Sequence, residues 1–288
     1  MIVPPRIDAM PKHFFNEASD AAKYDAYVAK SIPFYTASLT AAAQEVANTF
    51  RRSGQTQVTI LDIGCGTGNV AARIANVVDP AYCDLVLVDS NHGMVDHAAR
   101  KARGLGFDNP KVVCASFRTD DWDRDIAANS VDIVIALLTL DHMEQDVELT
   151  SLFGKLRRIL RNTGRFLFGE KCCDSSGVSQ LVFERMIEIR KIDMLERSLL
   201  PVADVERWHR HILADDILRP FPVLLRIARE SGFCLENALG VPLPRCPSDL
   251  SKETFFGMRT LQTLSIEEIN ESDRAYGIAM AILKPDSC

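Results

Sequence analysis

Continuous apolar runs alternate with helical stripes along most of this chain. Strands buried on both faces carry uninterrupted apolar residues, whereas a helix at a sheet repeats them every three to four positions, as 145–160 does. The expected strands are 58–63, 84–89, 111–116, 131–138, a strand that ends at 170–172, 234–241 and 276–284. This alternation predicts an α/β fold built on a mostly parallel sheet.

Two kinds of helical segment lie outside this alternation. Residues 1–56 are expected to form an irregular arm and then a helical lid that is broken at Pro33. Residues 57–285 form one α/β domain with insertions at 174–220 and 242–273, since 288 residues are long for one domain and short for two. The first insertion predicts a helical cap over the carboxyl edge of the sheet, where open α/β sheets bind ligands.

The first strand runs into glycines at alternate positions, Gly64, Gly66 and Gly68. Glycine admits unusual backbone conformations and lets a ligand approach the main chain. A dinucleotide-binding turn has the spacing Gly-x-Gly-x-x-Gly, but here the third glycine comes one residue early. Asp62, two residues before the first glycine, would repel a pyrophosphate and attract a cation. S-adenosylmethionine fits, because it carries an ammonium, a sulfonium and a carboxylate that suits loop N–H groups.

The sequence Asp62-x-Gly64-x-Gly66-x-Gly68 resembles motif I of the class I S-adenosylmethionine-dependent methyltransferases. The resemblance covers residues 20–285. It implies a Rossmann-like seven-stranded sheet, mostly parallel with an antiparallel last strand, and S-adenosylmethionine as cofactor. Cys65 lies inside the motif and is a candidate cofactor contact for that reason.

Further cofactor contacts are expected where the next two strands end. Asp89 ends the second strand about twenty residues after the loop, so its carboxylate would accept bonds from both ribose hydroxyls. The resemblance implies that Ser90 and Met94, in the turn and helix that follow, lie beside the adenine. Many relatives have an acid after the third strand; this chain has Ser116, an alternative acceptor, and Phe117, which would cover the ring.

The fourth strand ends at Thr139-Leu140-Asp141-His142, where related enzymes often carry a similar sequence along the methyl-transfer pocket. His142 is the candidate general base and Asp141 its possible orienter. A solvated Asp and a structural His explain the same residues, and that alternative stays open.

A second resemblance concerns one subgroup, the carboxy-S-adenosylmethionine synthases. It rests on Lys30-Ser-Ile-Pro-Phe-Tyr35 and on the pair Glu170-Lys171. In that subgroup the tyrosine helps to hold the cofactor, so Tyr35 is a candidate contact, although a packing aromatic ring is the alternative. Arg210 aligns approximately with the arginine that reads the extra carboxylate there.

Charge and composition limit the classes of partner, metal site and cellular location that the sequence allows. The net charge is −6 and no run of five basic residues occurs, so nucleic acid is disfavoured although a local patch around Arg157, Arg158, Arg161 and Arg165 stays open. Eight scattered cysteines without a Cys-x-x-Cys pair indicate thiols of a reducing cytoplasm. His209 and His211 would face different sides of a helix, so no metal site is predicted. No apolar stretch reaches membrane-spanning length, and we expect a cytoplasmic monomer or homodimer.

Three functions are compatible with these residues. The first is methyl transfer by in-line displacement to an O, N or S nucleophile of a small organic molecule. The second is a carboxymethyl-type cofactor enzyme of tRNA modification. The third is a cyclase or binding module that holds the cofactor without transferring its methyl group.

Overall fold

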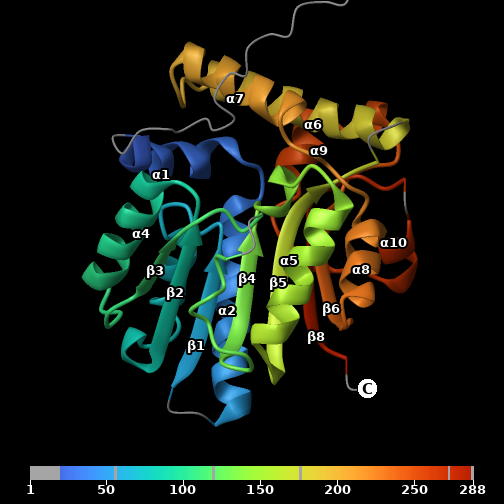
Figure 1. Cartoon of the computed structure of the whole chain (residues 1–288). Helices are drawn as coiled ribbons and strands as arrows, with labels where there is room; N and C mark the ends of the chain where they lie inside the picture. Colours follow the sequence, from blue (N-terminus) through green and yellow to red (C-terminus); the bar gives the residue numbers. More distant parts are fainter. Residues whose placement is uncertain (1–19, 55–56, 119–120, 175–176, 272, 287–288) are drawn as a thin grey trace, which may run out of the picture.

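A single mixed sheet forms the centre of the computed structural model, which describes residues 20–54, 57–118, 121–174, 177–271 and 273–286 (Figure 1). Its strand order is β3-β2-β1-β4-β5-β8-β6-β7. The strands are β1 (Val58–Ile63), β2 (Cys83–Asp89), β3 (Lys111–Cys114), β4 (Val131–Leu137), β5 (Leu160–Cys172), β6 (Phe233–Pro242), β7 (Gln262–Thr263) and β8 (Tyr276–Pro285).

The pairing confirms the expected mostly parallel sheet with an antiparallel last strand. β1 pairs parallel with β2 and β4, β2 with β3, and β4 with β5. β8 inserts antiparallel between β5 and β6. The two-residue β7 is an eighth strand at the edge of the sheet, which no apolar pattern in the sequence predicts.

Helices cover both faces of the sheet, and each face has its own apolar core. On one face lie α2 (Tyr35–Ser53), α3 (Asn69–Ile74) and α4 (His92–Gly104). On the other lie α5 (Asp146–Ile159) and α8 (Phe221–Glu230), where the ring of Phe153 packs 5.1 Å from that of Phe166. Parallel strands need such cover on both faces, because their side chains are apolar throughout.

Several helices lie at the carboxyl edge of the sheet, where α6 and α7 cross above it in Figure 1. They are α1 (Asp20–Ser31), α6 (Val178–Glu196), α7 (Val202–Ala214) and α9 (Lys252–Gly257), with the short turn η2 (Leu140–His142) after β4. The helix α10 (Ile266–Asn270) lies beside α8, η1 (Pro80–Tyr82) precedes β2, and η3 (Pro247–Asp249) precedes α9. A third core cluster joins α1, α6 and α7 through side chains such as Tyr27, Phe183 and Trp208. The helix α1 falls within residues 1–56, and α6 with α7 fall within the predicted insertion 174–220; that they act as a lid and a cap stays a prediction. None of the helices in the described part of the chain has the length and apolar character of a membrane span.

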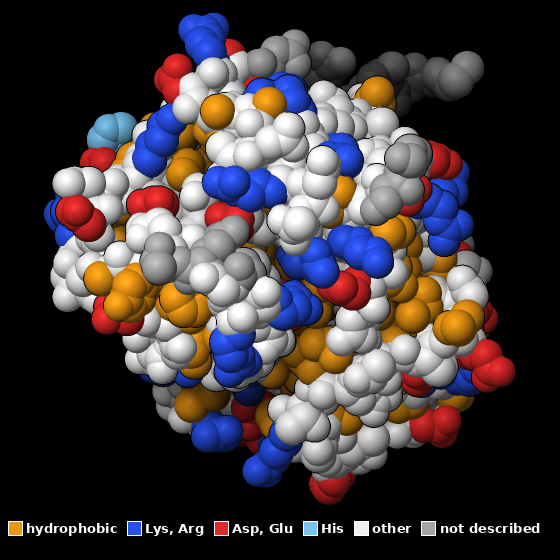
Figure 2. All heavy atoms as spheres, turned by 90° about the horizontal axis from the view of Figure 1, so that it is seen from below, with side chains coloured by type: hydrophobic (Ala, Val, Ile, Leu, Met, Phe, Trp, Pro, Cys, Tyr) orange, Lys and Arg blue, Asp and Glu red, His pale blue; other side chains and the backbone are white. Residues whose placement is uncertain are grey.

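The arginine cluster noted in the sequence lies at the opposite end of the molecule. Figure 2 views this end, and Lys and Arg side chains there alternate with acidic ones. Arg158 pairs with Asp123 at 2.7 Å, and Arg161 pairs with Asp132 at 3.0 Å. The acidic partners reduce the charge that these arginines could offer to phosphates; whether nucleic acid binds stays a prediction.

Candidate active site

A cavity of about 690 Å³ lies at the carboxyl edge of the sheet, between the strand ends, α1 and α7. This volume is within the usual range for small-molecule sites. Nine of the residues that the sequence predicted for the site line it: Gly64, Gly66, Asp89, Ser90, Met94, Ser116, Phe117, Asp141 and His142. Asp62, Cys65 and Tyr35 line a smaller pocket of about 50 Å³, which shares Gly64 and Gly66 with the cavity.

The glycine loop takes a conformation that needs glycine. Gly64, Gly66 and Gly68 have φ of 67°, 49° and 79°, in the left-handed region. A Cβ on Gly66 would lie 3.9 Å from the Tyr24 ring at the cavity wall, whereas a Cβ on Gly68 would lie 3.0 Å from the Ala98 Cα. Gly68 therefore lets α3 pack on α4 and lines neither pocket.

The N–H groups of this loop are already engaged. Gly64 and Cys65 donate to the Val88 carbonyl at 2.8 and 3.0 Å, and Gly66 donates to Asp89 Oδ2 at 2.9 Å. Our expectation that loop N–H groups receive a ligand carboxylate is therefore not met at these positions.

Asp89 is fixed at the tip of β2 by two backbone donors. Its Oδ2 accepts from Gly66 and its Oδ1 accepts from the N–H of Asn91 at 2.8 Å. Each carboxylate oxygen has further lone pairs, so the group can still accept from ligand hydroxyls. Ser90 and Met94, from the turn and helix that follow, line the same wall of the cavity.

Asp62 is a buried acid with an unsatisfied oxygen. It is the next-to-last residue of β1, and its Oδ2 has no hydrogen-bond partner among the described residues. Burial, and then the nearby Asp89, raise its pKa to about 8. Asp62 and Asp89 are thus two neighbouring carboxyl groups, and one oxygen of Asp62 lacks a partner among the described residues. Such a pair suits a ligand that brings positive charge, as S-adenosylmethionine does.

The lid helix is tied to the glycine loop through Asp25. This carboxylate accepts from the Thr67 hydroxyl, from Asn69 Nδ2 at 3.1 Å and from Lys101 Nζ at 2.5 Å. Asn69 also donates to the Tyr35 hydroxyl at 3.0 Å. Sequence reasoning missed Asp25, because an acid on a helix gives no local sign of a distant partner.

A buried lysine also lines the cavity. Lys171, at the end of β5, places Nζ 2.8 Å from Asp141 Oδ2 and 2.8 Å from Asp216 Oδ2. Burial alone would lower the pKa of Lys171, but the two carboxylates outweigh it and raise this pKa. Burial raises the pKa of the Asp141 carboxyl, but the positive charge of Lys171 outweighs this effect and holds that pKa below its usual range.

Glu170 holds the turn that carries Asp141 and His142. Its Oε1 accepts from the N–H groups of Thr139 and Leu140, both at 2.8 Å. Burial, and then Asp141, raise the pKa of Glu170 well above its usual value. In the pair Glu170-Lys171, the first residue thus accepts hydrogen bonds from the start of η2, and the second forms an ion pair with Asp141 inside this turn.

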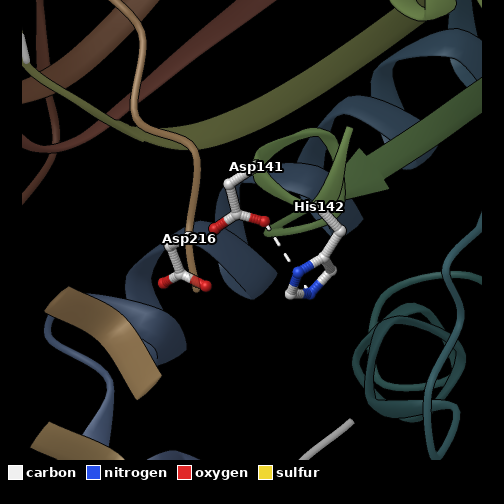
Figure 3. Close-up of side chains that lie close together, drawn as sticks. All are labelled: Asp141, His142 and Asp216. Atoms are coloured by element: carbon white, nitrogen blue, oxygen red, sulfur yellow. Dashed lines mark ion pairs between the residues drawn. The ribbon is translucent and has the colours of Figure 1, made fainter. Parts of the chain in front are cut away.

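His142 does not form a hydrogen-bonded pair with Asp141. Its Nε2 lies 3.8 Å from Asp141 Oδ1, along the dashed line of Figure 3, and its side chain is 42% exposed. The ring of His211 on α7 lies 6.1 Å away, and its Nε2 is 3.6 Å from Asp216 Oδ1. Sequence reasoning missed Asp216 as a site residue and considered His211 only for its spacing from His209.

The arginines give no support to a carboxylate-reading site. Arg210 is exposed on α7 and does not line the cavity. Arg118 lines it, but its guanidinium pairs with Glu148 at 2.6 Å and with Glu144 at 3.9 Å.

Comparison with known proteins defines the class. Residues 60–164, which include the glycine loop, Asp89 and η2, match the family described as methyltransferase domain. Residues 60–164 thus resemble a methyltransferase domain, and the chain has the fold of S-adenosylmethionine-dependent methyltransferases. Glu170, Lys171 and the helices α6 and α7 lie outside the matched range.

Particular relatives are distant. The carboxy-S-adenosyl-L-methionine synthase of Helicobacter pylori is 23% identical over 181 residues, which cover 63% of this chain and 70% of that protein. The CurJ carbon methyltransferase has a TM-score of 0.54 at 18% identity, covering 93% of this chain and 58% of that one. An S-adenosylmethionine-dependent methyltransferase from Clostridium acetobutylicum has a TM-score of 0.54 at 11% identity, with 93% and 98% covered. At these identities the similarity to the solved structures shows a shared fold and does not extend to a shared substrate.

Proposed function

We propose that this protein transfers the methyl group of S-adenosylmethionine to an O, N or S atom of a small organic molecule. One observation carries the proposal: a single cavity is lined both by the glycine loop with Asp89, here called the cofactor end, and by Asp141, His142 and Lys171, here called the acceptor end. The cofactor end and an acceptor end therefore meet inside one enclosure.

When bound, S-adenosylmethionine supplies an electrophilic methyl group on a sulfonium. The residues of the chain position the two partners and exclude water, because a near-attack geometry replaces a bimolecular encounter. Asp89 would hold the ribose, Asp62 would face the positive charge, and α1 with α7 would close the cavity. For a hydroxyl acceptor, a nitrogen of His142 would take the proton as the acceptor oxygen displaces the sulfonium in line.

The cofactor site is tested by titration calorimetry with S-adenosylmethionine. Asp89→Ala should abolish measurable binding, whereas Asp84→Ala, an exposed acid on the same strand, should bind as the wild type does. Near-normal affinity in Asp89→Ala would remove this site from consideration.

The transfer step is tested with a panel of small acceptors by following S-adenosylhomocysteine. Turnover at saturating substrate should fall by about 10²-fold or more in His142→Ala if the acceptor is a hydroxyl. Unchanged turnover would exclude His142 as the base, and no product with any acceptor would favour a protein that only binds the cofactor.

A carboxymethyl-type cofactor enzyme of tRNA modification is the second candidate, supported by the likeness to the synthase of Helicobacter pylori. The exposed Arg210 and the paired Arg118 weigh against it. Mass spectrometry of the cofactor released from purified protein separates the two, because a carboxylated cofactor is heavier by one CO₂.

A further inference from the structure

Three potential metal ligands converge at the acceptor end of the cavity. One oxygen of Asp141, one of Asp216 and a ring nitrogen of His142 all lie within 4.8 Å of one another (Figure 3). Asp141 and His142 come from η2, and Asp216 follows α7, so the cap completes the group. Spacing along the chain could not predict it, which is why the sequence led us to expect no metal.

Buried carboxylate oxygens at this place lack hydrogen-bond donors among the described residues. Asp141 Oδ1 and Asp216 Oδ1 accept no hydrogen bond from any residue that the structure describes. Their side chains are 2% and 1% exposed. A buried acceptor without a partner costs about 1–3 kcal/mol, so the arrangement favours a positive group between these oxygens.

Lys171 does not fill that need, because it binds the other oxygens. Its Nζ contacts Oδ2 of both aspartates at 2.8 Å and so fixes the two carboxylates from behind. Metal-binding carboxylates are commonly held in this way by an outer hydrogen bond or ion pair.

His211 adds a fourth ligand candidate with the appropriate tautomer. Its Nδ1 lies 2.9 Å from Asp215 Oδ2, and a carboxylate only accepts, so the proton of a neutral ring is on Nδ1. The lone pair of Nε2 is then 3.6 Å from Asp216 Oδ1. A carboxylate on the far nitrogen is the usual companion of a metal-binding histidine.

We propose that Asp141, His142 and Asp216, together with His211, bind a divalent transition-metal ion at the acceptor end of the cavity. Mixed imidazole and carboxylate donors favour Mn²⁺, Fe²⁺, Co²⁺ or Zn²⁺ over Mg²⁺ or Ca²⁺. Metal bonds of about 2.0–2.2 Å require the ligands to draw together, and the half-exposed His142 side chain has room to move. If the proposed function is right, the ion would face an acceptor that carries an oxygen donor, and His142 would then hold the ion instead of serving as the general base.

Metal binding is measured on the full chain after treatment with EDTA, by titration with Mn²⁺ followed by electron paramagnetic resonance. We expect one ion per chain in the wild type, displaced by Zn²⁺. His142→Ala and Asp216→Asn should each weaken binding by about tenfold or more. His92→Ala, which removes an exposed histidine paired with Asp96 at 3.0 Å, should leave affinity unchanged.

Circular dichroism checks that each variant is folded. If Asp216→Asn unfolds, His142→Ala still tests the site, because the half-exposed His142 side chain can be removed with little effect on the fold. No binding at millimolar Mn²⁺ or Zn²⁺, or equal weakening in His92→Ala, would overturn the proposal. Titration with S-adenosylmethionine in EDTA is independent of the ion. If the proposed function is wrong, S-adenosylmethionine will not bind in this titration; if only the metal site is wrong, S-adenosylmethionine will still bind.

Discussion

Replacing Lys171 by methionine removes a single charge from a buried cluster while keeping the length of the side chain. The ammonium contacts Asp141 and Asp216 at 2.8 Å each, and all three side chains are at most 5% exposed. Without it, two carboxylates remain in a dry environment with no ammonium between them. Breaking a buried pair from one side typically costs about 3–5 kcal/mol, and we expect the free energy of unfolding to fall by this amount at neutral pH.

The loss should depend on pH with a definite sign. Lys171 holds the pKa of Asp141 below its usual value, so this carboxyl contributes stability above that value and loses it as the pH falls through the lowered pKa. In Lys171→Met the lowering is absent, and the carboxyls take up protons at higher pH. The difference between wild type and variant should therefore shrink from pH 7.5 to pH 5.

Urea unfolding of the EDTA-treated protein at both pH values measures these differences. Lys252→Met is the matched control, because Lys252 pairs with Glu196 on the surface, where solvent screens the attraction and the pair contributes little to stability. Adding Asp216→Asn to Lys171→Met should recover part of the loss. A loss below about 1 kcal/mol at pH 7.5, or one that grows toward pH 5, would refute the buried-triad reasoning.

Three further predictions concern the cofactor end. Asp62→Asn should flatten the decline in unfolding free energy between pH 5.5 and 7.5, since the raised pKa of about 8 makes the wild type lose up to about 1.4 kcal/mol per pH unit there. Urea unfolding without cofactor measures it. Gly68→Ala should destabilise more than Gly54→Ala in thermal unfolding, because both have positive φ but a Cβ at Gly54 meets open space. Asp25→Ala should speed amide hydrogen exchange in α1, and unchanged exchange would mean that the lid is held elsewhere.

The cofactor end could be predicted because its signals are local. The apolar run before Gly64 fixes a buried strand, and the positive φ at Gly64 and Gly66 is the reason that glycine recurs there. Asp89 follows from strand order, since parallel neighbours end at the same edge of the sheet. Which of these residues contact the cofactor stays a prediction.

The acceptor end could not be predicted in the same way. Asp216 lies 75 positions after Asp141 and reaches it only because α6 and α7 fold back over the sheet. Amphipathic stripes predict that these helices pack, but they do not give the angle or register at which they do so. The ion pairs of Lys171 therefore depend on packing that the sequence pattern leaves open.

The lid helix α1 connects the two ends. Asp25 binds the glycine loop, while two residues later Tyr27 is buried in the cluster of α6 and α7, with its hydroxyl 3.3 Å from the Asp204 carbonyl. A change at the loop must be transmitted to the cap or be absorbed within one helical turn. Cofactor binding at the loop should therefore also slow amide exchange in α7, which carries His211 and leads to Asp216. This coupling would order the acceptor end only when the methyl donor is in place.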